Sequence, residues 1–345
     1  MNEIDQPIAA NLPPSNRRPT SHDVARAAGV AQSTVSRCFQ ADSRISLQTR
    51  DHVRKAAEEL GYFPNKLARG LITKRSNMVG VIVTEYTLNH NTDLVYTLGE
   101  ALRAAEFGLL LLVVKDDTRV GEIMASTLEY PLDGLISCAL IERADIDRLL
   151  QRGVSVVFFN RSVSHPGVDC LLTNHANGAA EVAQHFRAAG FDNILCMAGP
   201  VNAPVSKARS RGFLEALAEA GMADVPTVYS DYSYDGGKRA FLEHVADHGV
   251  PRAVFCVNDH IAMGVQDACR FDLGLTVPGD VSIIGFDDVR EAARPTYALT
   301  TLRQQLEPMA KQAVGLLVRR MTQPDALSST VLVQAQLIRR GSARI

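Results

Sequence analysis

The 345-residue chain contains no tryptophan, and no two of its six cysteines have CxxC spacing. Cysteines scattered through apolar stretches provide neither a zinc site nor a disulfide framework, so we expect reduced, buried thiols in a cytoplasmic protein. No apolar run approaches the roughly 18 residues that a membrane-spanning helix needs, and the N-terminus is polar. We therefore expect neither a membrane segment nor a secretory signal.

The motifs of common catalytic sites are also missing. The chain has no GxSxG, no P-loop and no HExxH sequence, and its nine histidines are dispersed. Two adjacent carboxylate pairs occur, Asp116-Asp117 and Asp287-Asp288, but the side chains of neighbouring residues point apart and seldom form an acid/base couple. We therefore predict no catalytic residues, no metal site and no cofactor.

Charge is unevenly distributed, although the formal net charge is only −2. Residues 17–75 carry 12 Lys and Arg against 5 Asp and Glu, whereas the rest of the chain is acidic. A small basic module joined to a larger acidic one indicates a polyanionic partner at one end of the chain. A solvated run of charges would give the same count, so charge alone does not decide between the two.

The basic module begins after residues 1–19, which contain four prolines and no periodicity and which we interpret as a disordered tail. Three short helices are predicted over about 20–28, 32–39 and 46–60. Thr20 can cap the first, with Asp23 bonding back to it, before Gly29 ends it. Ser46 caps the third.

The first two helices have the spacing of a helix-turn-helix. The second exposes four polar residues opposite Val35: Gln32, Ser33, Ser36 and Arg37. Arg can bond guanine bidentately, Gln can pair with adenine, and Ser can bond phosphate. Many three-helix cores contain such a turn, but the basic local charge favours nucleic-acid binding.

Residues 66–74 form a basic and only weakly helical stretch. Leu67, Ala68, Arg69 and Leu71 are good helix formers, but Gly70 lies in the middle and costs about 1 kcal/mol relative to Ala. Isolated helices of fewer than about a dozen residues are seldom stable in water. We therefore expect a marginal helix here.

From residue 77 onward, short apolar runs alternate with amphipathic helix patterns. Continuous apolar strands between helices indicate parallel sheets that are covered on both faces, and the remaining length is enough for two such sheets. A polar or glycine turn follows most of the runs, which places polar groups at the carboxyl ends of the strands, where ligands of open α/β sheets bind. The predicted strands are 79–83, 109–114, 134–136, 154–159, 194–197, 253–257 and 281–284.

The ordered motifs resemble those of the LacI/GalR family of transcriptional regulators. In the first module the match includes Asp23-Val24-Ala25, Ala28-Gly29-Val30 and Ser33-Thr34-Val35-Ser36-Arg37. In the core it includes Asp133-Gly134-Leu135-Ile136, Ala198-Gly199-Pro200, Val257-Asn258-Asp259 and Ile284-Gly285-Phe286-Asp287. The resemblance covers residues 20–341.

The resemblance implies an N-terminal helix-turn-helix headpiece followed by a core like that of periplasmic binding proteins, with two doubly wound parallel-sheet subdomains. Together with the sequence pattern it defines a tail at 1–19, a DNA-binding headpiece at 20–65 and a hinge helix and linker at 66–76. The effector-binding and dimerisation core is then 77–341. Its N-subdomain comprises about 77–173 and 304–328, and its C-subdomain about 174–303 and 329–341.

In that family the recognition helix reads the major groove of DNA. The resemblance therefore assigns base reading to Gln32, Ser33 and Arg37 and phosphate contacts to Thr34 and Ser36. Leu71 would insert as a wedge into the minor groove from a hinge helix that forms on DNA; the alternative is a buried linker residue. Ala31 departs from the usual Ser or Thr cap, which costs about 1 kcal/mol unless another group replaces it.

For the effector site, the resemblance assigns ligand contacts to five residues: Asn160, Arg209, Tyr232, Asn258 and Asp287. Arg209 and Asp287 suit charge-assisted bonds to a hydroxylated or charged ligand, and Tyr232 could stack on an apolar ring face. Structural alternatives remain for three of them: Asp287 could cap a helix, Arg209 could pair with a structural carboxylate, and Tyr232 could anchor a loop. Asp259 is assigned mainly to helix capping, and residues 84–93 depart from the family pattern.

We therefore expect a cytoplasmic, nucleoid-associated homodimer that binds palindromic operator DNA, most simply as a repressor of catabolic or transport genes. Its effector would be a sugar or sugar acid bound between the two core subdomains. The alternatives are a periplasmic-type binding protein without a DNA role and an enzyme on a similar core. The sequence does not identify the effector, nor whether the effector induces or co-represses.

Overall fold

A computed structural model describes residues 17, 19–39, 45–63 and 75–345. The chain divides into two compact units, Met1–Ser76 and Asn77–Ile345. The predicted tail, except for residues 17 and 19, and the predicted hinge helix at 66–74 lie outside the described residues. Among the residues that are described, no helix is long and apolar enough to cross a membrane.

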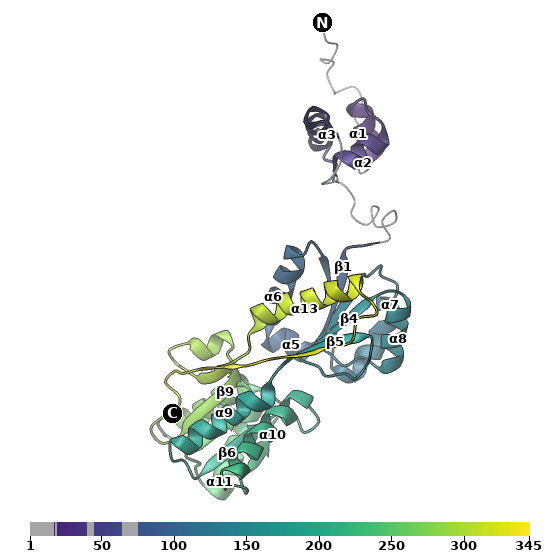
Figure 1. The fold of residues 1–345 in the computed structure, drawn as a ribbon. Coiled ribbons are helices and arrows are strands. Elements are labelled where there is room, and N and C mark those ends of the chain that lie inside the picture. The colour runs from purple at the N-terminus through teal and green to yellow at the C-terminus, as the bar shows by residue number, and fades with distance from the viewer. Residues whose placement is uncertain (1–16, 18, 40–44, 64–74) are drawn as a thin grey trace. The chain divides into compact units, whose positions relative to one another are not determined.

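Among its described residues, the first unit has three helices: α1 (Ser21–Ala27), α2 (Gln32–Cys38) and α3 (Leu47–Glu59) (Figure 1). They share a small core in which buried side chains such as Val24, Val35 and Val53 pack together. The predicted caps are confirmed. Thr20 and Asp23 form a reciprocal capping box at α1, and the Ser46 hydroxyl accepts from the amide of Thr49 at α3.

Two six-stranded sheets form the second unit, which confirms the predicted architecture. The first sheet has the order β11-β5-β4-β3-β1-β2, and all its strand pairs are parallel. Its strands are β1 (Met78–Thr84), β2 (Gly108–Val114), β3 (Gly134–Ser137), β4 (Ser155–Phe159), β5 (Val168–Thr173) and β11 (Thr330–Val333).

Helices cover both faces of this first sheet (Figure 1). On one face α6 and α13 pack on Val79, Val81 and Val83, and on the other face α7 and α8 pack on Ile82. The alternation of β1 side chains between two cores explains why this strand is apolar throughout. The helices of this subdomain are α5 (Glu85–His90), α6 (Thr92–Ala104), η2 (Asp117–Arg119), α7 (Val120–Thr127), α8 (Arg143–Gln151) and α13 (Leu306–Thr322).

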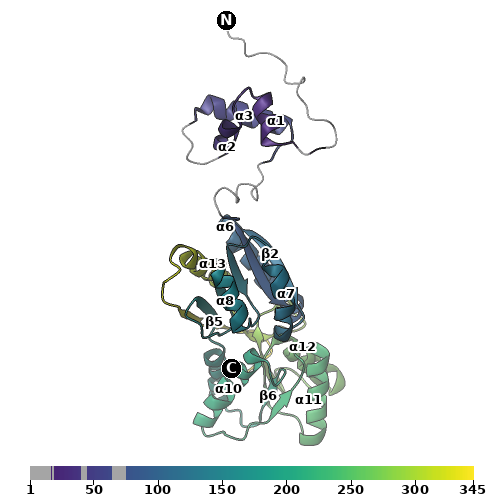
Figure 2. The same ribbon diagram turned by 90° about the vertical axis from the view of Figure 1, so that its right-hand side faces the viewer.

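The second sheet has the same topology as the first. Its strand order is β12-β10-β9-β8-β6-β7, and only β12 runs antiparallel. Its strands are β6 (Ile194–Ala198), β7 (Thr227–Tyr229), β8 (Ala253–Cys256), β9 (Ser282–Asp287), β10 (Thr300–Arg303) and β12 (Gln336–Ile338). Figure 2 shows α10 and α11 on opposite faces of this sheet. The helices are α9 (His175–Ala188), α10 (Pro204–Glu219), α11 (Tyr234–His248), α12 (Asp259–Asp267), η3 (Ala268–Asp272) and η4 (Arg290–Ala293).

The chain passes between the two subdomains three times: from β5 to α9, from β10 to α13 and from β11 to β12. The third passage corrects the predicted boundary at 329. Thr330–Val333 pairs with β5 and so belongs to the N-subdomain, and only the chain after it joins the C-subdomain. This strand has only four residues and is half-exposed, so its short apolar stretch gave no clear strand signal.

The end of the core also lies beyond the predicted residue 341. The Ser342 side chain is fully buried, and its hydroxyl donates to the Ile283 carbonyl. The last residues therefore pack along the second sheet rather than leaving it.

Candidate functional site

The outer surface of α2 presents the residues that were assigned to DNA. Gln32, Ser33, Ser36 and Arg37 are exposed, whereas Thr34 is half-buried. The Gln32 amide nitrogen donates to the Ser21 hydroxyl at 3.1 Å, which restrains its side chain on α1 while leaving its amide oxygen available. Leu71, the sixth residue of this group, lies outside the described residues.

Ala31 is the N-cap residue of helix α2, and its side chain forms no capping hydrogen bond. The absence of a capping bond agrees with the expectation drawn from the sequence. One of the amides at the start of the recognition helix therefore lacks the side-chain partner that Thr20 and Ser46 supply to α1 and α3.

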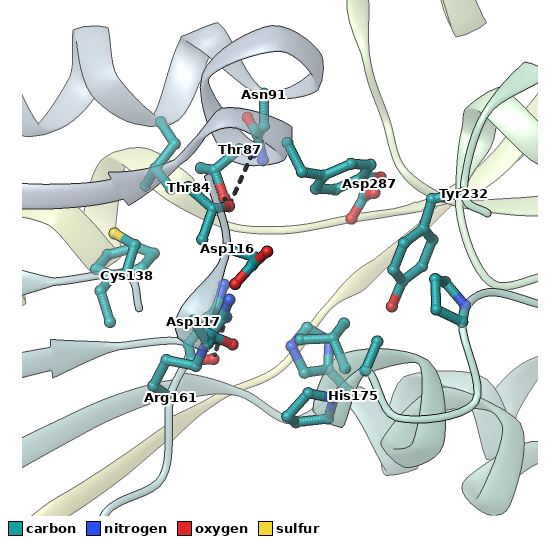
Figure 3. Close-up of a pocket in the computed structure, with 18 of the residues that line it drawn as sticks. Thr84, Thr87, Asn91, Asp116, Asp117, Cys138, Arg161, His175, Tyr232 and Asp287 are labelled. Atoms are coloured by element: carbon teal, nitrogen blue, oxygen red, sulfur yellow. Dashed lines mark hydrogen bonds and ion pairs between the residues drawn. The ribbon is translucent and has the colours of Figure 1, made fainter. Parts of the chain in front are cut away.

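A cavity of about 430 Å³ opens between the two subdomains at the carboxyl ends of their strands (Figure 3). A cavity of this size fits a small metabolite. The side chains around it combine apolar surface with hydrogen-bonding groups from both sheets. Its polar and aromatic lining includes Thr84, Tyr86, Lys115, Asp116, Asp117, Asn160, Arg161, His175, Arg209, Asp231, Tyr232, Asp287 and Gln304.

Arg209, on α10, is the most connected side chain of the cavity. Its guanidinium donates to Asp287 Oδ1 at 2.7 Å, to the Val257 carbonyl at 2.6 Å and to His175 Nδ1 at 3.3 Å. Its Cζ lies 3.7 Å from the centre of the Phe286 ring. Only 3% of its side chain is exposed, so this is a buried, charge-assisted network with a fixed geometry. The alternative role of Arg209, pairing with a carboxylate, is therefore met by Asp287, which is itself an assigned effector residue.

Gln304 links the two subdomains at the floor of the cavity. Its amide nitrogen donates to Asp287 Oδ1 at 2.7 Å, and its amide oxygen accepts from Asn160 Nδ2 at 2.7 Å and from the Thr173 hydroxyl at 2.9 Å. Asn160 and Thr173 belong to the first sheet and Asp287 to the second. Gln304 lies on the passage from β10 to α13. Side chains that line the cavity are therefore hydrogen-bonded directly to a segment that connects the subdomains.

Two aromatic rings form another contact across the cavity. The rings of Tyr86 and Tyr232 lie 4.9 Å apart, one from each subdomain. Asn258 holds both residues, since its Nδ2 donates to the Tyr86 hydroxyl at 2.7 Å and to the Tyr232 carbonyl at 3.0 Å. Burial raises the pKa of Tyr86 above its usual range, and Asp287 adds to the rise, so the phenol is neutral.

Among the described residues, three of the seven non-glycine residues with positive φ line the cavity. Asn160, Tyr232 and Asp287 have φ angles of 52°, 70° and 118°. Non-glycine residues rarely adopt such conformations, and those that do are concentrated at binding sites, where the surrounding structure enforces them. This observation supports a ligand site independently of the cavity.

The structure brings four of the five assigned effector residues to the cavity lining: Asn160, Arg209, Tyr232 and Asp287. Asn258 is fully buried behind it, where it caps α12 and positions the two tyrosines. Asp259 does not cap α12, contrary to expectation. It is fully buried, accepts from the Thr301 hydroxyl and the Val289 amide, and has a pKa that burial raises well above the usual range.

Tyr86, Arg161, His175 and Gln304 are among the lining residues that the resemblance did not assign to the effector. Tyr86 and Arg161 follow strands that were predicted, so they lie at the carboxyl ends where polar turns indicated the site. His175 and Gln304 follow β5 and β10, and no apolar run had indicated those strands. Nothing in the sequence alone placed these two residues beside Asp287.

The comparisons with known proteins agree with both units. Residues 20–65 match the model of bacterial regulatory proteins of the lacI family, and residues 183–343 match a periplasmic binding protein-like domain. The chain is 29% identical over 330 residues to the ribose operon repressor of Escherichia coli (strain K12), covering 94% of this chain and 99% of that protein. It is 30% identical over 339 residues to the HTH-type transcriptional regulator CelR of Thermobifida fusca, covering 94% and 98%.

Among solved structures, the lac repressor dimer bound to operator and the anti-inducer ONPF superposes with a TM-score of 0.84 at 24% identity, covering 94% of this chain and 99% of that one. The fold and the two sites therefore define a helix-turn-helix transcription regulator with a ligand-binding core. The chain belongs to the lacI family of bacterial regulatory proteins. It is a ligand-responsive DNA-binding repressor, and its lacI-family DNA-binding domain argues against the alternative of a binding protein without a DNA role.

Proposed function

We propose that the chain works as a homodimer on a palindromic operator, that α2 reads each half-site, and that a sugar or sugar acid in the cavity changes operator affinity. The observation that carries this proposal is the cavity itself. It lies between two subdomains, and its charged and amide side chains already form a network that crosses from one to the other. The ribose operon repressor, a relative by sequence, is named for a sugar operon.

The assigned roles follow from the residue chemistry. Gln32, Ser33 and Arg37 are exposed on one helix and would contact base edges, while Thr34 and Ser36 would contact phosphates. Leu71 would act as the minor-groove wedge of a hinge that forms on DNA. Two-fold symmetry of the dimer predicts half-sites about one helical turn apart.

The proposed response is a shift in population between open and closed arrangements of the core. A ligand held by Arg209 and Asp287 on one side and by Asn160 on the other favours the closed arrangement by its difference in affinity for the two. Gln304 lies on a segment that connects the subdomains and forms hydrogen bonds to Asn160 and Asp287. It would therefore transmit the preference for the closed arrangement. No chemical conversion of the ligand is part of this mechanism, and we place the protein in the cytoplasm with the nucleoid.

The test is selection of duplexes from a random DNA library by the purified full-length chain, followed by gel shifts of the selected operator with and without sugars. We expect a palindromic consensus, discrimination on the order of 10³–10⁷ over random DNA, and a change in affinity with at least one sugar or sugar acid. Binding of all duplexes with one salt-dependent affinity would contradict the proposal.

The variant Arg37→Ala tests whether α2 reads bases. We expect a loss of about 1–3 kcal/mol that is confined to one base position of each half-site, because the guanidinium would read one base pair. Equal weakening on every sequence would show that Arg37 contacts phosphate instead. Arg54→Ala, on α3 of the same unit, is the control.

A further inference from the structure

His175, the first residue of α9, carries a hydrogen-bond donor that no group of the described residues accepts. The residue lines the cavity (Figure 3) and is 8% exposed. The Nδ1 atom accepts from Arg209 Nε at 3.3 Å, so this nitrogen is unprotonated. The neutral ring must then carry its proton on Nε2, and this atom is buried without a partner among the described residues.

Burial, together with two nearby guanidinium groups, keeps the ring neutral. Burial, Arg209 and Arg161 together lower the pKa of His175 well below its usual range. The ring therefore offers one donor in a fixed tautomer, and it cannot add a positive charge to the cavity. A buried donor without a partner is costly, and a ligand acceptor at this place would remove that cost.

The cavity holds no surplus of positive charge for an anion. Arg209 lies 2.7 Å from Asp287, and Arg161 lies 3.4 Å from Asp117, so each guanidinium already has its carboxylate. Carboxylates outnumber cationic side chains in the lining by one: Asp116, Asp117, Asp231 and Asp287 against Lys115, Arg161 and Arg209. A hydroxyl can accept from His175 and donate to a carboxylate, whereas an anionic oxygen can only accept.

We propose that His175 Nε2–H donates to an uncharged oxygen of the effector, and that the site selects a neutral hydroxylated ring over the corresponding acid. This inference rests on the proposed function and narrows its effector class from sugars and sugar acids to neutral sugars. His175 is thereby a specificity-determining residue.

Two substitutions separate the donor from the structural role of the ring. His175→Asn can keep an acceptor for Arg209 near the place of Nδ1, but it has no donor that reaches the place of Nε2. His175→Gln can place its amide donor near Nε2. His185→Asn, on the same helix and outside the cavity lining, is the matched control.

The experiment is calorimetric titration of the full-length chain with D-glucose and D-glucuronate and with D-galactose and D-galacturonate, two pairs in which the sugar and its acid share the same ring. We expect at least one neutral member to bind tenfold or more tightly than its acid. His175→Asn should weaken that binding about five- to tenfold, while His175→Gln and His185→Asn stay within about twofold of the parent. The melting temperature of His175→Asn without ligand should stay within a few degrees of the parent value.

Several outcomes would overturn the inference. Equal or tighter binding of the acids would do so, as would unchanged affinity in His175→Asn. If acids bind and alter operator affinity, the proposed function stands and only this inference falls. If no sugar or acid binds, the proposed effector class is itself rejected, and the inference falls with it.

A second readout needs no ligand. ¹⁵N spectra of histidine-labelled protein should show one ring with its proton on Nε2 that stays neutral well below the usual histidine pKa, and this signal should vanish in His175→Asn. A proton on Nδ1, or titration of that ring near pH 6.5, would contradict the proposed donor.

Discussion

At the scale of single residues, the pocket depends on a carboxylate held in an unfavourable backbone conformation. Asp287 has a φ of 118° and accepts from both Arg209 and Gln304. Removing its side chain would leave the Arg209 charge buried and unpaired, which is strongly destabilising. Asparagine is a milder probe, because it keeps an acceptor of the same size and tolerates positive φ better than most residues.

Asp287→Asn should therefore weaken the response of operator binding to the ligand. We expect the ligand concentration for half-maximal change in gel shifts to rise tenfold or more, since a charge-assisted bond becomes a neutral one. Operator affinity without ligand should stay within about twofold, as the headpiece is unaltered. An unchanged dose response would show that the ligand binds elsewhere.

A second residue-scale prediction concerns Asp23 in the first unit. The Thr20 hydroxyl, which donates to the carboxylate at 2.7 Å, is the main cause of its lowered pKa, and Arg17 contributes. A folded pKa below the unfolded value of about 3.9 means that the carboxylate stabilises the headpiece above that pH. This stabilisation is lost as pH falls through the folded pKa.

Scanning calorimetry of the full chain should show this loss as a headpiece transition that moves to lower temperature below about pH 4. Asp23→Asn should lower the same transition at pH 7 and flatten its dependence between pH 2 and 5. A parallel pH dependence in parent and variant would contradict the assigned role.

At the scale of elements, the weak point is the start of α2. Helices α1 and α3 each receive a side-chain cap, but Ala31 supplies none to α2. Its seven residues also make it too short to be stable alone, so packing of Val35 and Cys38 supports it.

Ala31→Ser should stabilise the headpiece by about 1 kcal/mol, because a serine hydroxyl can accept from a free amide of the first turn. Urea unfolding followed by circular dichroism measures the change. Ser46→Ala, which removes the existing cap of α3, should shift the same transition by a similar amount in the opposite direction. A destabilising effect of Ala31→Ser would mean that α2 cannot accept the capping geometry.

The strands also show which elements the sequence pattern could predict. Each of the seven predicted apolar runs overlaps a strand, because buried parallel strands must be apolar on both faces. Strand β5 escaped notice because Asp169 lies within it, and this fully buried carboxylate is paired with Arg319 and Arg320. The edge strands β7, β11 and β12 are three or four residues long and half-exposed, so they leave no periodic signal.

The candidate site was predictable only in part, for a related reason. The turns after apolar runs indicated the correct edge of each sheet, and motif resemblance supplied Arg209 and Asp287. His175 and Gln304 follow strands on connections between subdomains, and their approach to Arg209 and Asp287 is a product of tertiary folding. Local sequence carries no information on such an approach.

At the scale of the whole molecule, residues 66–76 join the proposed DNA-binding unit to the proposed ligand-binding unit. The sequence predicts a marginal hinge helix there, and the resemblance assigns Leu71 as its wedge. Formation of such a helix on the correct site would favour specific complexes over nonspecific ones.

Leu71→Ala should weaken binding to the selected operator about tenfold or more while leaving binding to random duplexes within about twofold. Filter binding on both DNAs at one salt concentration measures the ratio, with Ile72→Ala as the neighbouring control. Equal loss on both DNAs would remove the wedge from the mechanism.

The three passages between subdomains also have a consequence for synthesis. The N-subdomain needs α13 to cover one face of its sheet and β11 to complete its edge, yet both come from the last 40 residues of the chain. A growing polypeptide therefore cannot complete its N-subdomain until β11 (Thr330–Val333) has been synthesised. A chain that terminates before β11 therefore contains two incomplete subdomains and no complete one.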